Sequence, residues 1–136
     1  NVRAPYFLTA ALAPGMAARG GSIVNVSTMV AELGMPGSSA YAASKAALAS
    51  LTRTWAGEFA GFGVRVNAIT VGPTKTDGTD GMSEEEVGFV VGLTKLGRIA
   101  EPAEIAEAIV FLASPRSSYM TGANLAADGG ATAVMA

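Results

Sequence analysis

The 136-residue sequence contains neither cysteine nor histidine. The absence of cysteine excludes a disulfide framework, and the absence of both residue types excludes an ordinary zinc site and a Ser-His or Cys-His nucleophile pair. Charge is also scarce: 9 basic and 11 acidic residues give a net charge of −2, which provides no basic surface for nucleic acid or for an anionic membrane. Any proton transfer must therefore use tyrosine, lysine or a carboxylate.

Long apolar runs are missing as well. No stretch approaches the ~20 apolar residues that a membrane span needs, and no signal-peptide pattern is present. We therefore expect a cytoplasmic protein whose partners are small molecules or further copies of itself. Half of the residues are nonetheless hydrophobic and only 15% are charged, so part of the apolar surface should face something outside this chain.

The pattern of apolar residues predicts an alternation of helices and strands. Short β-branched runs bounded by glycine or proline indicate strands, and apolar positions at steps of three and four indicate helices. The expected helices are 1–18 with a bend near Pro14, 39–61 and 102–114, and the expected strands are 22–27, 64–70 and 123–127. Right-handed crossovers would make these strands parallel in one sheet with helices on both faces, which is an α/β doubly wound fold.

Two segments need separate interpretation. Gly57, Gly61 and Gly63 have the letter pattern of a nucleotide-binding glycine loop, but such a loop follows a strand and opens a helix, whereas this one closes a helix and precedes a strand. We interpret it as helix termination. Residues 77–96 contain a short helix expected after Ser83, a good N-cap, and are typical of either a substrate lid or a plain surface connection.

Tyr41 and Lys45 stand four residues apart in the expected helix 39–61, so their side chains lie on one face. An ammonium group held beside a phenol favours the phenolate, which makes such a pair a usable general acid and base near neutral pH. Two fixed positions are also compatible with an aromatic anchor beside a solvated lysine. In parallel sheets, ligands bind beyond the carboxyl ends of strands, so the strand end at Ser27-Thr28 and the loop 70–76 should border one crevice.

The order of motifs resembles the C-terminal half of the short-chain dehydrogenase/reductase family, in its classical branch. The matching segments are Asn1-Val2 at a helix start, 21–28, 41–45, 64–68, Gly72-Pro73 with Thr76, and 111–114 leading to Gly122 and Asp128-Gly129-Gly130. Each motif is weak alone, but together and in family order they are specific. The resemblance implies a Rossmann-type fold, NAD or NADP as the cofactor, and hydride transfer between that cofactor and an alcohol or carbonyl substrate.

The resemblance also implies catalytic roles. Tyr41 corresponds to the general acid and base, and Lys45 to the residue that activates it and binds the nicotinamide ribose. Thr28 stands thirteen residues before the tyrosine, where the family usually has a serine that hydrogen-bonds the substrate oxygen. Ser27 is the less favoured substitute, because its side chain should lie on the other side of the strand. Asn1 corresponds to a helix asparagine that holds a water beside the lysine.

Gly72, Thr74 and Thr76 correspond to the family's contacts with the nicotinamide carboxamide. The glycine-rich turn after the first strand and the Asn-Asn-Ala-Gly strand end of the family do not occur in this sequence. Residues 1–136 are therefore expected to form a partial NAD(P)-binding domain, the catalytic half of a longer enzyme without its nucleotide-binding half. This chain alone is expected to be inactive.

The family resemblance further implies a homodimer or homotetramer. We expect the helices 1–18 and 39–61 to form its contact through two apolar stripes, Tyr6, Phe7 and Leu12 on the first and Leu48, Leu51, Trp55 and Phe59 on the second. Two alternatives remain open: an inactive relative that acts as a binding or oligomerisation module, and an extended-branch sugar-nucleotide epimerase or dehydratase, which shares the Tyr-x-x-x-Lys pattern. The substrate pocket expected from 30–36 and 77–96 is partly apolar, which leaves thioesters, ketosteroids and simple ketones open.

Overall fold

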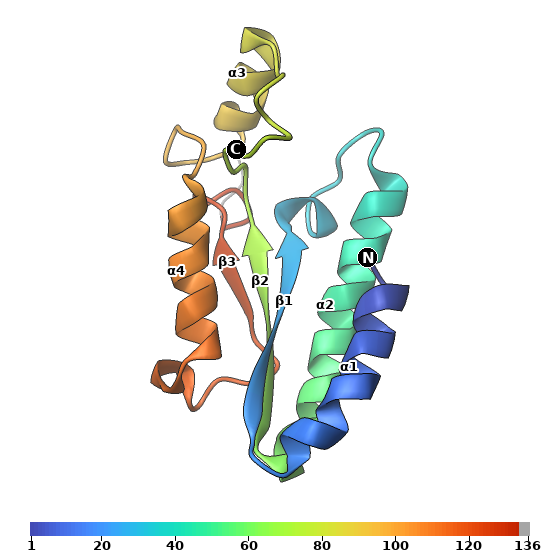
Figure 1. The fold of residues 1–136 in the computed structure, drawn as a ribbon. Helices are drawn as coiled ribbons and strands as arrows, with labels where there is room; N and C mark the ends of the chain where they lie inside the picture. The colour runs from blue at the N-terminus through green and yellow to red at the C-terminus, as the bar shows by residue number, and fades with distance from the viewer. Residues whose placement is uncertain (134–136) are drawn as a thin grey trace.

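The structure is a computed structural model that describes residues 1–133 (Figure 1). Its elements follow in the order α1 Arg3–Ala17, β1 Gly21–Thr28, η1 Met29–Ala31, α2 Ser39–Phe59, η2 Ala60–Phe62, β2 Val64–Val71, α3 Glu84–Gly92, α4 Pro102–Ala113, η3 Pro115–Ser117 and β3 Asn124–Ala127, where η denotes a 3₁₀-helix. The predicted alternation of helices and strands is confirmed, with ends that move by one or two residues. Helix α1 continues through Pro14.

The three strands form one parallel sheet in the order β1-β2-β3. The register places Thr28 of β1 opposite Val71 of β2, and Val71 opposite Ala127 of β3. All three strands therefore end at the same edge of the sheet. The loops that follow them emerge side by side at this carboxyl edge, as the parallel arrangement predicted.

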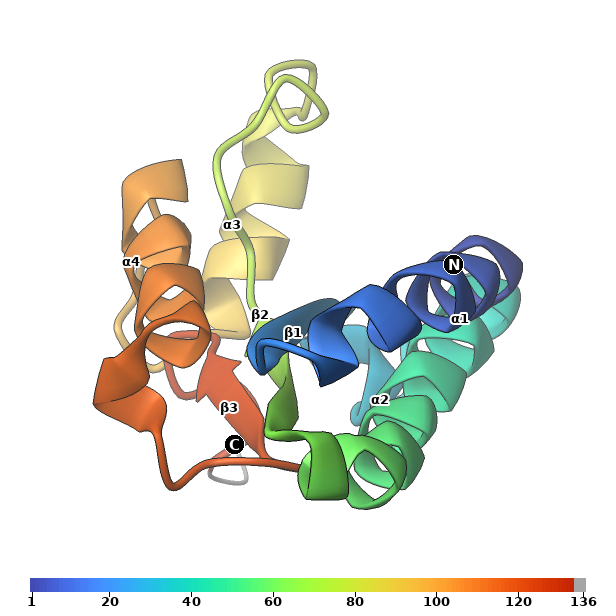
Figure 2. The same cartoon turned by 60° about the horizontal axis from the view of Figure 1, so that its bottom comes forward.

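Helices cover both faces of the sheet, which confirms the α/β doubly wound class. Helices α1 and α2 lie on one face, α4 lies on the other, and α3 stands beyond the carboxyl edge (Figures 1 and 2). Trp55 and Leu48 of α2 pack on the β2 residue Val66. On the opposite face, α4 packs on β2 in a second cluster whose buried members are Ile69, Ile105 and Leu112. A parallel sheet needs apolar cover on both faces, and these helices provide it.

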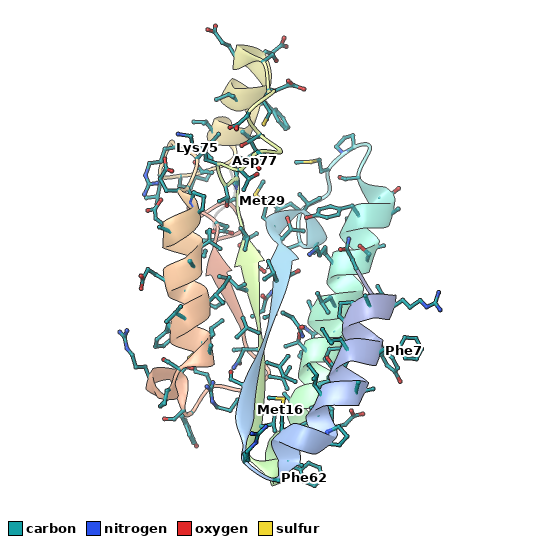
Figure 3. The ribbon with its side chains drawn as sticks, viewed as in Figure 1. Phe7, Met16, Met29, Phe62, Lys75 and Asp77 are labelled. Atoms are coloured by element: carbon teal, nitrogen blue, oxygen red, sulfur yellow. The ribbon has the colours of Figure 1, made fainter. Side chains whose placement is uncertain are left out.

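The two apolar stripes differ from the prediction. Leu48 and Trp55 on α2 are only 4% exposed, and Leu51 and Phe59 pack against the same cluster, so the α2 stripe packs into the core of this chain. The sequence pattern could not distinguish a stripe that faces the core from a stripe at a subunit contact, because both have the same residue spacing. The α1 stripe is different: Tyr6, Phe7 and Leu12 are exposed, and Phe7 points away from the protein (Figure 3).

Local signals at helix ends are confirmed. After η2, Gly63 adopts a left-handed conformation with φ of +69° and its N–H donates to the Ala60 carbonyl, so the glycine segment closes the helical run before β2 begins, although Gly57 itself lies inside α2. Ser83 caps α3 through a reciprocal pair of hydrogen bonds with Glu86. The segment 77–96 thus contains one short, well-capped helix beyond the edge of the sheet.

Candidate active site

Helix α2 holds Lys45 against the end of strand β1. The Lys45 Nζ donates a hydrogen bond of 2.7 Å to the carbonyl oxygen of Val26, two residues before the end of the strand. Burial lowers the pKa of the Lys45 ammonium from its ordinary value. The backbone of β1 therefore fixes the position of this cation.

Tyr41 lies one helical turn before Lys45 on α2 and is 44% exposed, so its phenol is open to a ligand. The helix turn between them is tied to the start of the chain: the Ser44 hydroxyl donates to the Tyr41 carbonyl at 2.7 Å, and the Asn1 side chain donates to the Ser44 hydroxyl at 3.2 Å. Asn1 and Lys45 line the same cavity of about 390 Å³. The structure thus brings Asn1, Tyr41 and Lys45 to one end of α2.

Ser27 and Thr28 use their hydroxyl groups in different ways. Ser27 donates to the Lys45 carbonyl of α2 at 3.4 Å, which commits this side chain to the α2 side of the sheet. Thr28 accepts a hydrogen bond of 3.4 Å from the backbone N–H of Val30. Within residues 1–133, no acceptor is found for the Thr28 hydroxyl hydrogen, which leaves it able to donate to a bound molecule.

The segment after Thr28 packs against the first turn of the helix that carries Tyr41. Met29 and Val30 form a small apolar cluster with Ala42, the residue after Tyr41. Leu93, just beyond α3, contacts the same cluster. The β1 end, the start of α2 and the end of α3 therefore border one region at the carboxyl edge.

The loop after β2 reaches the same edge, where Figure 3 shows Lys75 and Asp77 at the end of the sheet that also carries Met29. The Thr74 hydroxyl donates to the Gly72 carbonyl at 3.1 Å and so braces the loop. The Thr76 side chain is exposed, and its hydroxyl has no protein partner in the described part of the chain. Of the two threonines, Thr76 therefore has the freer hydroxyl for a ligand.

Glu32 is a residue of this edge that the sequence analysis missed. Its carboxylate accepts hydrogen bonds from the Thr70 hydroxyl of β2 at 2.8 Å and from the Asn124 side chain of β3 at 2.9 Å. These bonds tie the loop after β1 to both neighbouring strands. A single glutamate in a loop carries no recognisable signal, because its partners lie 38 and 92 residues away.

A small apolar cavity of about 70 Å³ lies between the loop after β1 and α3. Its lining consists of hydrocarbon and thioether side chains with one glycine: Met29, Val30, Leu33, Gly34, Met35, Pro36, Phe89 and Leu93. A cavity therefore lies between residues 30–36 and the segment 77–96, and its lining is apolar. Across the described chain there is no cluster of acidic residues suited to a metal ion, nor a helix long and apolar enough to span a membrane.

Comparisons with known proteins place the chain in a family. A family profile described as enoyl-(acyl carrier protein) reductase matches residues 1–132. The 3-oxoacyl-[acyl-carrier-protein] reductase of Thermotoga maritima is 43% identical over 131 residues, which cover 96% of this chain and 53% of that protein. The chain belongs to the short-chain dehydrogenase/reductase family.

Other members of the family show comparable similarity. The galactitol 2-dehydrogenase (L-tagatose-forming) of Cereibacter sphaeroides is 47% identical, with 97% of this chain and 54% of that protein covered. A solved short-chain dehydrogenase/reductase family protein, 56% identical, superposes with a TM-score of 0.88 over 98% of this chain and 55% of its own. The chain therefore has the Rossmann-type fold of this oxidoreductase family and spans about half the length of these relatives.

Proposed function

We propose that this chain is the catalytic half of an NAD(P)-dependent oxidoreductase that interconverts an alcohol and a carbonyl compound. The observation that carries the proposal is the placement of Lys45: its ammonium is held 2.7 Å from the Val26 carbonyl, one turn from an exposed Tyr41. Thr28, at the end of the same strand, has a hydroxyl hydrogen available for a ligand. These are a proton donor, its activating cation and a hydrogen-bond donor for the reacting oxygen.

In the reduction, the Tyr41 phenol transfers its proton to the substrate oxygen while the Thr28 hydroxyl donates a hydrogen bond to that oxygen. A nicotinamide bound beside these residues would supply the hydride for the carbonyl carbon. Lys45 favours the phenolate that remains and donates to the nicotinamide ribose, and Asn1 holds a water beside Lys45. In the oxidation, each transfer runs in the opposite direction.

The residues present fit one end of the cofactor. An ammonium group at Lys45 suits ribose hydroxyls, and the free hydroxyl of Thr76 with the backbone around Gly72 and Thr74 suits a carboxamide, which both donates and accepts hydrogen bonds. The adenine and pyrophosphate end has no counterpart in residues 1–133, because no strand there leads through a glycine turn into a helix in the order that binds phosphate. The proposed activity therefore belongs to a longer chain.

The proposal is tested in what we term the completed enzyme, in which residues 1–136 follow the nucleotide-binding half of the Thermotoga relative. We expect this protein to oxidise NADH or NADPH in the presence of an apolar ketone or a 3-oxoacyl thioester, because the substrate cavity is lined by apolar side chains. The measurement is the loss of reduced-nicotinamide absorbance. A folded completed enzyme that binds the cofactor and reduces none of a broad panel of ketones and thioesters would contradict the proposal.

The first prediction separates the two hydroxyls at the end of β1. Thr28→Ala should lower the turnover number of the completed enzyme at least about tenfold, because it removes a hydrogen-bond donor to the reacting oxygen. Ser27→Ala is the matched control: it also removes one hydroxyl, but that hydroxyl already donates to the Lys45 carbonyl. The measurement is the turnover number of both variants, from steady-state kinetics. If Ser27→Ala proved the more damaging, the assignment of Thr28 would be wrong.

The second prediction concerns assembly, because we also propose that the protein forms a homodimer or homotetramer through α1. Tyr6, Phe7 and Leu12 leave an apolar face exposed there, and an adjoining cavity of about 430 Å³ between α1 and α2 reaches Trp55. Phe7→Glu places a charge in this face and should reduce the mass of the completed enzyme at micromolar concentration, as measured by light scattering. Tyr119→Glu, at a fully exposed site after η3, should not change it. A monomeric parent protein, or an unchanged mass in Phe7→Glu, would count against this contact.

A further inference from the structure

The turn that follows β3 has a fixed and unusual shape. Gly129 and Gly130 both adopt left-handed conformations, with φ of +65° and +84°. The Asp128 carboxylate accepts hydrogen bonds from the N–H groups of Gly130 at 2.9 Å and Thr132 at 3.0 Å. These bonds close the turn on itself, so it can act as a rigid support for neighbouring segments.

The segment that ends α3 rests on this turn. The N–H groups of Lys95 and Leu96 both donate to the Gly129 carbonyl, at 2.7 Å and 3.1 Å. Thr94 is only 7% exposed; its hydroxyl lies 3.0 Å from the Val91 carbonyl and accepts from the Arg98 N–H at 3.3 Å. Residues 94–98 are thereby held both to the turn and to the end of α3.

The contact leaves little room for a side chain on the turn. A Cβ at Gly129 would lie 3.1 Å from the Thr94 Cβ, and a Cβ at Gly130 would lie 3.2 Å from the Lys95 Cβ. The end of α3 therefore packs directly on bare backbone. A Cβ added at Gly129 requires Thr94 or the turn to give way by a few tenths of an ångström.

The same turn supports two other walls of the site. A Cβ at Gly72 would lie 2.6 Å from the Asp128 Cα, and the Gly72 N–H donates to the Ala127 carbonyl at 3.1 Å, so the loop after β2 rests on it as well. Ala131, just after the turn, packs in the cluster of Met29 and Val30 beyond β1. The loops after β1 and β2 and the end of α3 therefore meet on this turn.

We propose that the Asp128–Gly130 turn sets the position of α3 over the substrate, and that Thr94 and Gly129 are the positioning residues of this contact. The inference rests on the proposed function, because it takes the cavity bounded by Phe89, Leu93 and Met29 as the place of an apolar substrate group. Leu93 immediately precedes Thr94, so a shift at Thr94 moves this wall directly. The loop after β2 is held separately, by the hydrogen bond from the Gly72 N–H to the Ala127 carbonyl.

The test compares Gly129→Ala with Gly97→Ala in the completed enzyme. Gly97 has nearly the same left-handed conformation, with φ of +66°, but nothing lies within 4 Å of its would-be Cβ, so it reproduces the backbone strain without the contact. We expect the KM of the best ketone or thioester to rise about tenfold more in Gly129→Ala than in Gly97→Ala, because the wall of the pocket is displaced. The turnover number and the affinity for the reduced cofactor should differ by less than about twofold.

A second pair of variants, at Thr94, tests the same contact independently of Gly129→Ala. Thr94→Val loses the hydroxyl that lies within hydrogen-bond distance of Val91 and Arg98, whereas Thr94→Ser keeps it, so only the valine variant should raise the substrate KM. Limited proteolysis within residues 77–92 gives a readout independent of activity and should be faster in Gly129→Ala and Thr94→Val than in their controls. Equal KM values and equal cleavage within both pairs would overturn the inference. An inactive parent would instead refute the proposed function, and the cleavage rates would still test the support of α3.

Discussion

Replacing Tyr41 with phenylalanine in the completed enzyme should lower the turnover number by more than ~100-fold while the affinity for the reduced cofactor stays within several-fold. The substitution removes only the phenol oxygen, the atom proposed to exchange a proton with the substrate. The ring and the helix remain, and Lys45 keeps its hydrogen bond to the Val26 carbonyl. The loss should therefore appear in the chemical step and hardly in cofactor binding.

The measurement combines steady-state kinetics with a fluorescence titration of NADH and NADPH. Tyr119→Phe is the matched control, because it removes the same oxygen from a fully exposed tyrosine far along the chain and should keep parental turnover. Retained activity in Tyr41→Phe would refute the assignment of the proton donor. Loss of cofactor binding together with loss of turnover would show that Tyr41 acts mainly as a binding residue.

The 136 residues expressed alone should neither bind a dinucleotide tightly nor catalyse hydride transfer. Among residues 1–133, β2 is the one strand that pairs with β1, so the other edge of β1 exposes backbone groups that no strand pairs. Beside that edge, a cavity of about 390 Å³ lies between α1 and β1 and is lined largely by apolar side chains, among them Leu8, Leu12 and Ile23. The site residues of this chain could bind the nicotinamide end of a cofactor, but residues 1–133 offer no phosphate-binding turn for its pyrophosphate.

Titration with NADH and NADPH, with absorbance followed in the presence of a diketone, tests this expectation. Light scattering should show aggregation of the isolated chain, because a parallel sheet normally has both faces and its neighbouring strands covered. Adding the nucleotide-binding half as a separate chain should reduce aggregation and restore binding. Micromolar affinity with turnover by residues 1–136 alone would show that the site is complete without that half.

Local signals in the sequence were enough to predict most of the framework. Strands and helices follow from periodicity, which depends only on which residues are neighbours along the chain. The same holds for the glycines that terminate α2 and for the Ser83 cap of α3, since each works within one turn of backbone. The four-residue spacing that puts Tyr41 and Lys45 on one helix face is local too. Together with the resemblance, these signals predicted the parallel sheet and the family.

The sequence by itself thus determined the elements, their parallel order and the side chains that carry the proposed chemistry. Tertiary structure alone decided that the apolar stripe of α2 faces the sheet, that Lys45 reaches the Val26 carbonyl, and that Glu32 ties the loop after β1 to β2 and β3. It also decided that Gly129 supports Thr94. These contacts join residues from about ten to about ninety positions apart. Their formation depends on how helices and loops pack on the sheet, and no local pattern of residues encodes that packing.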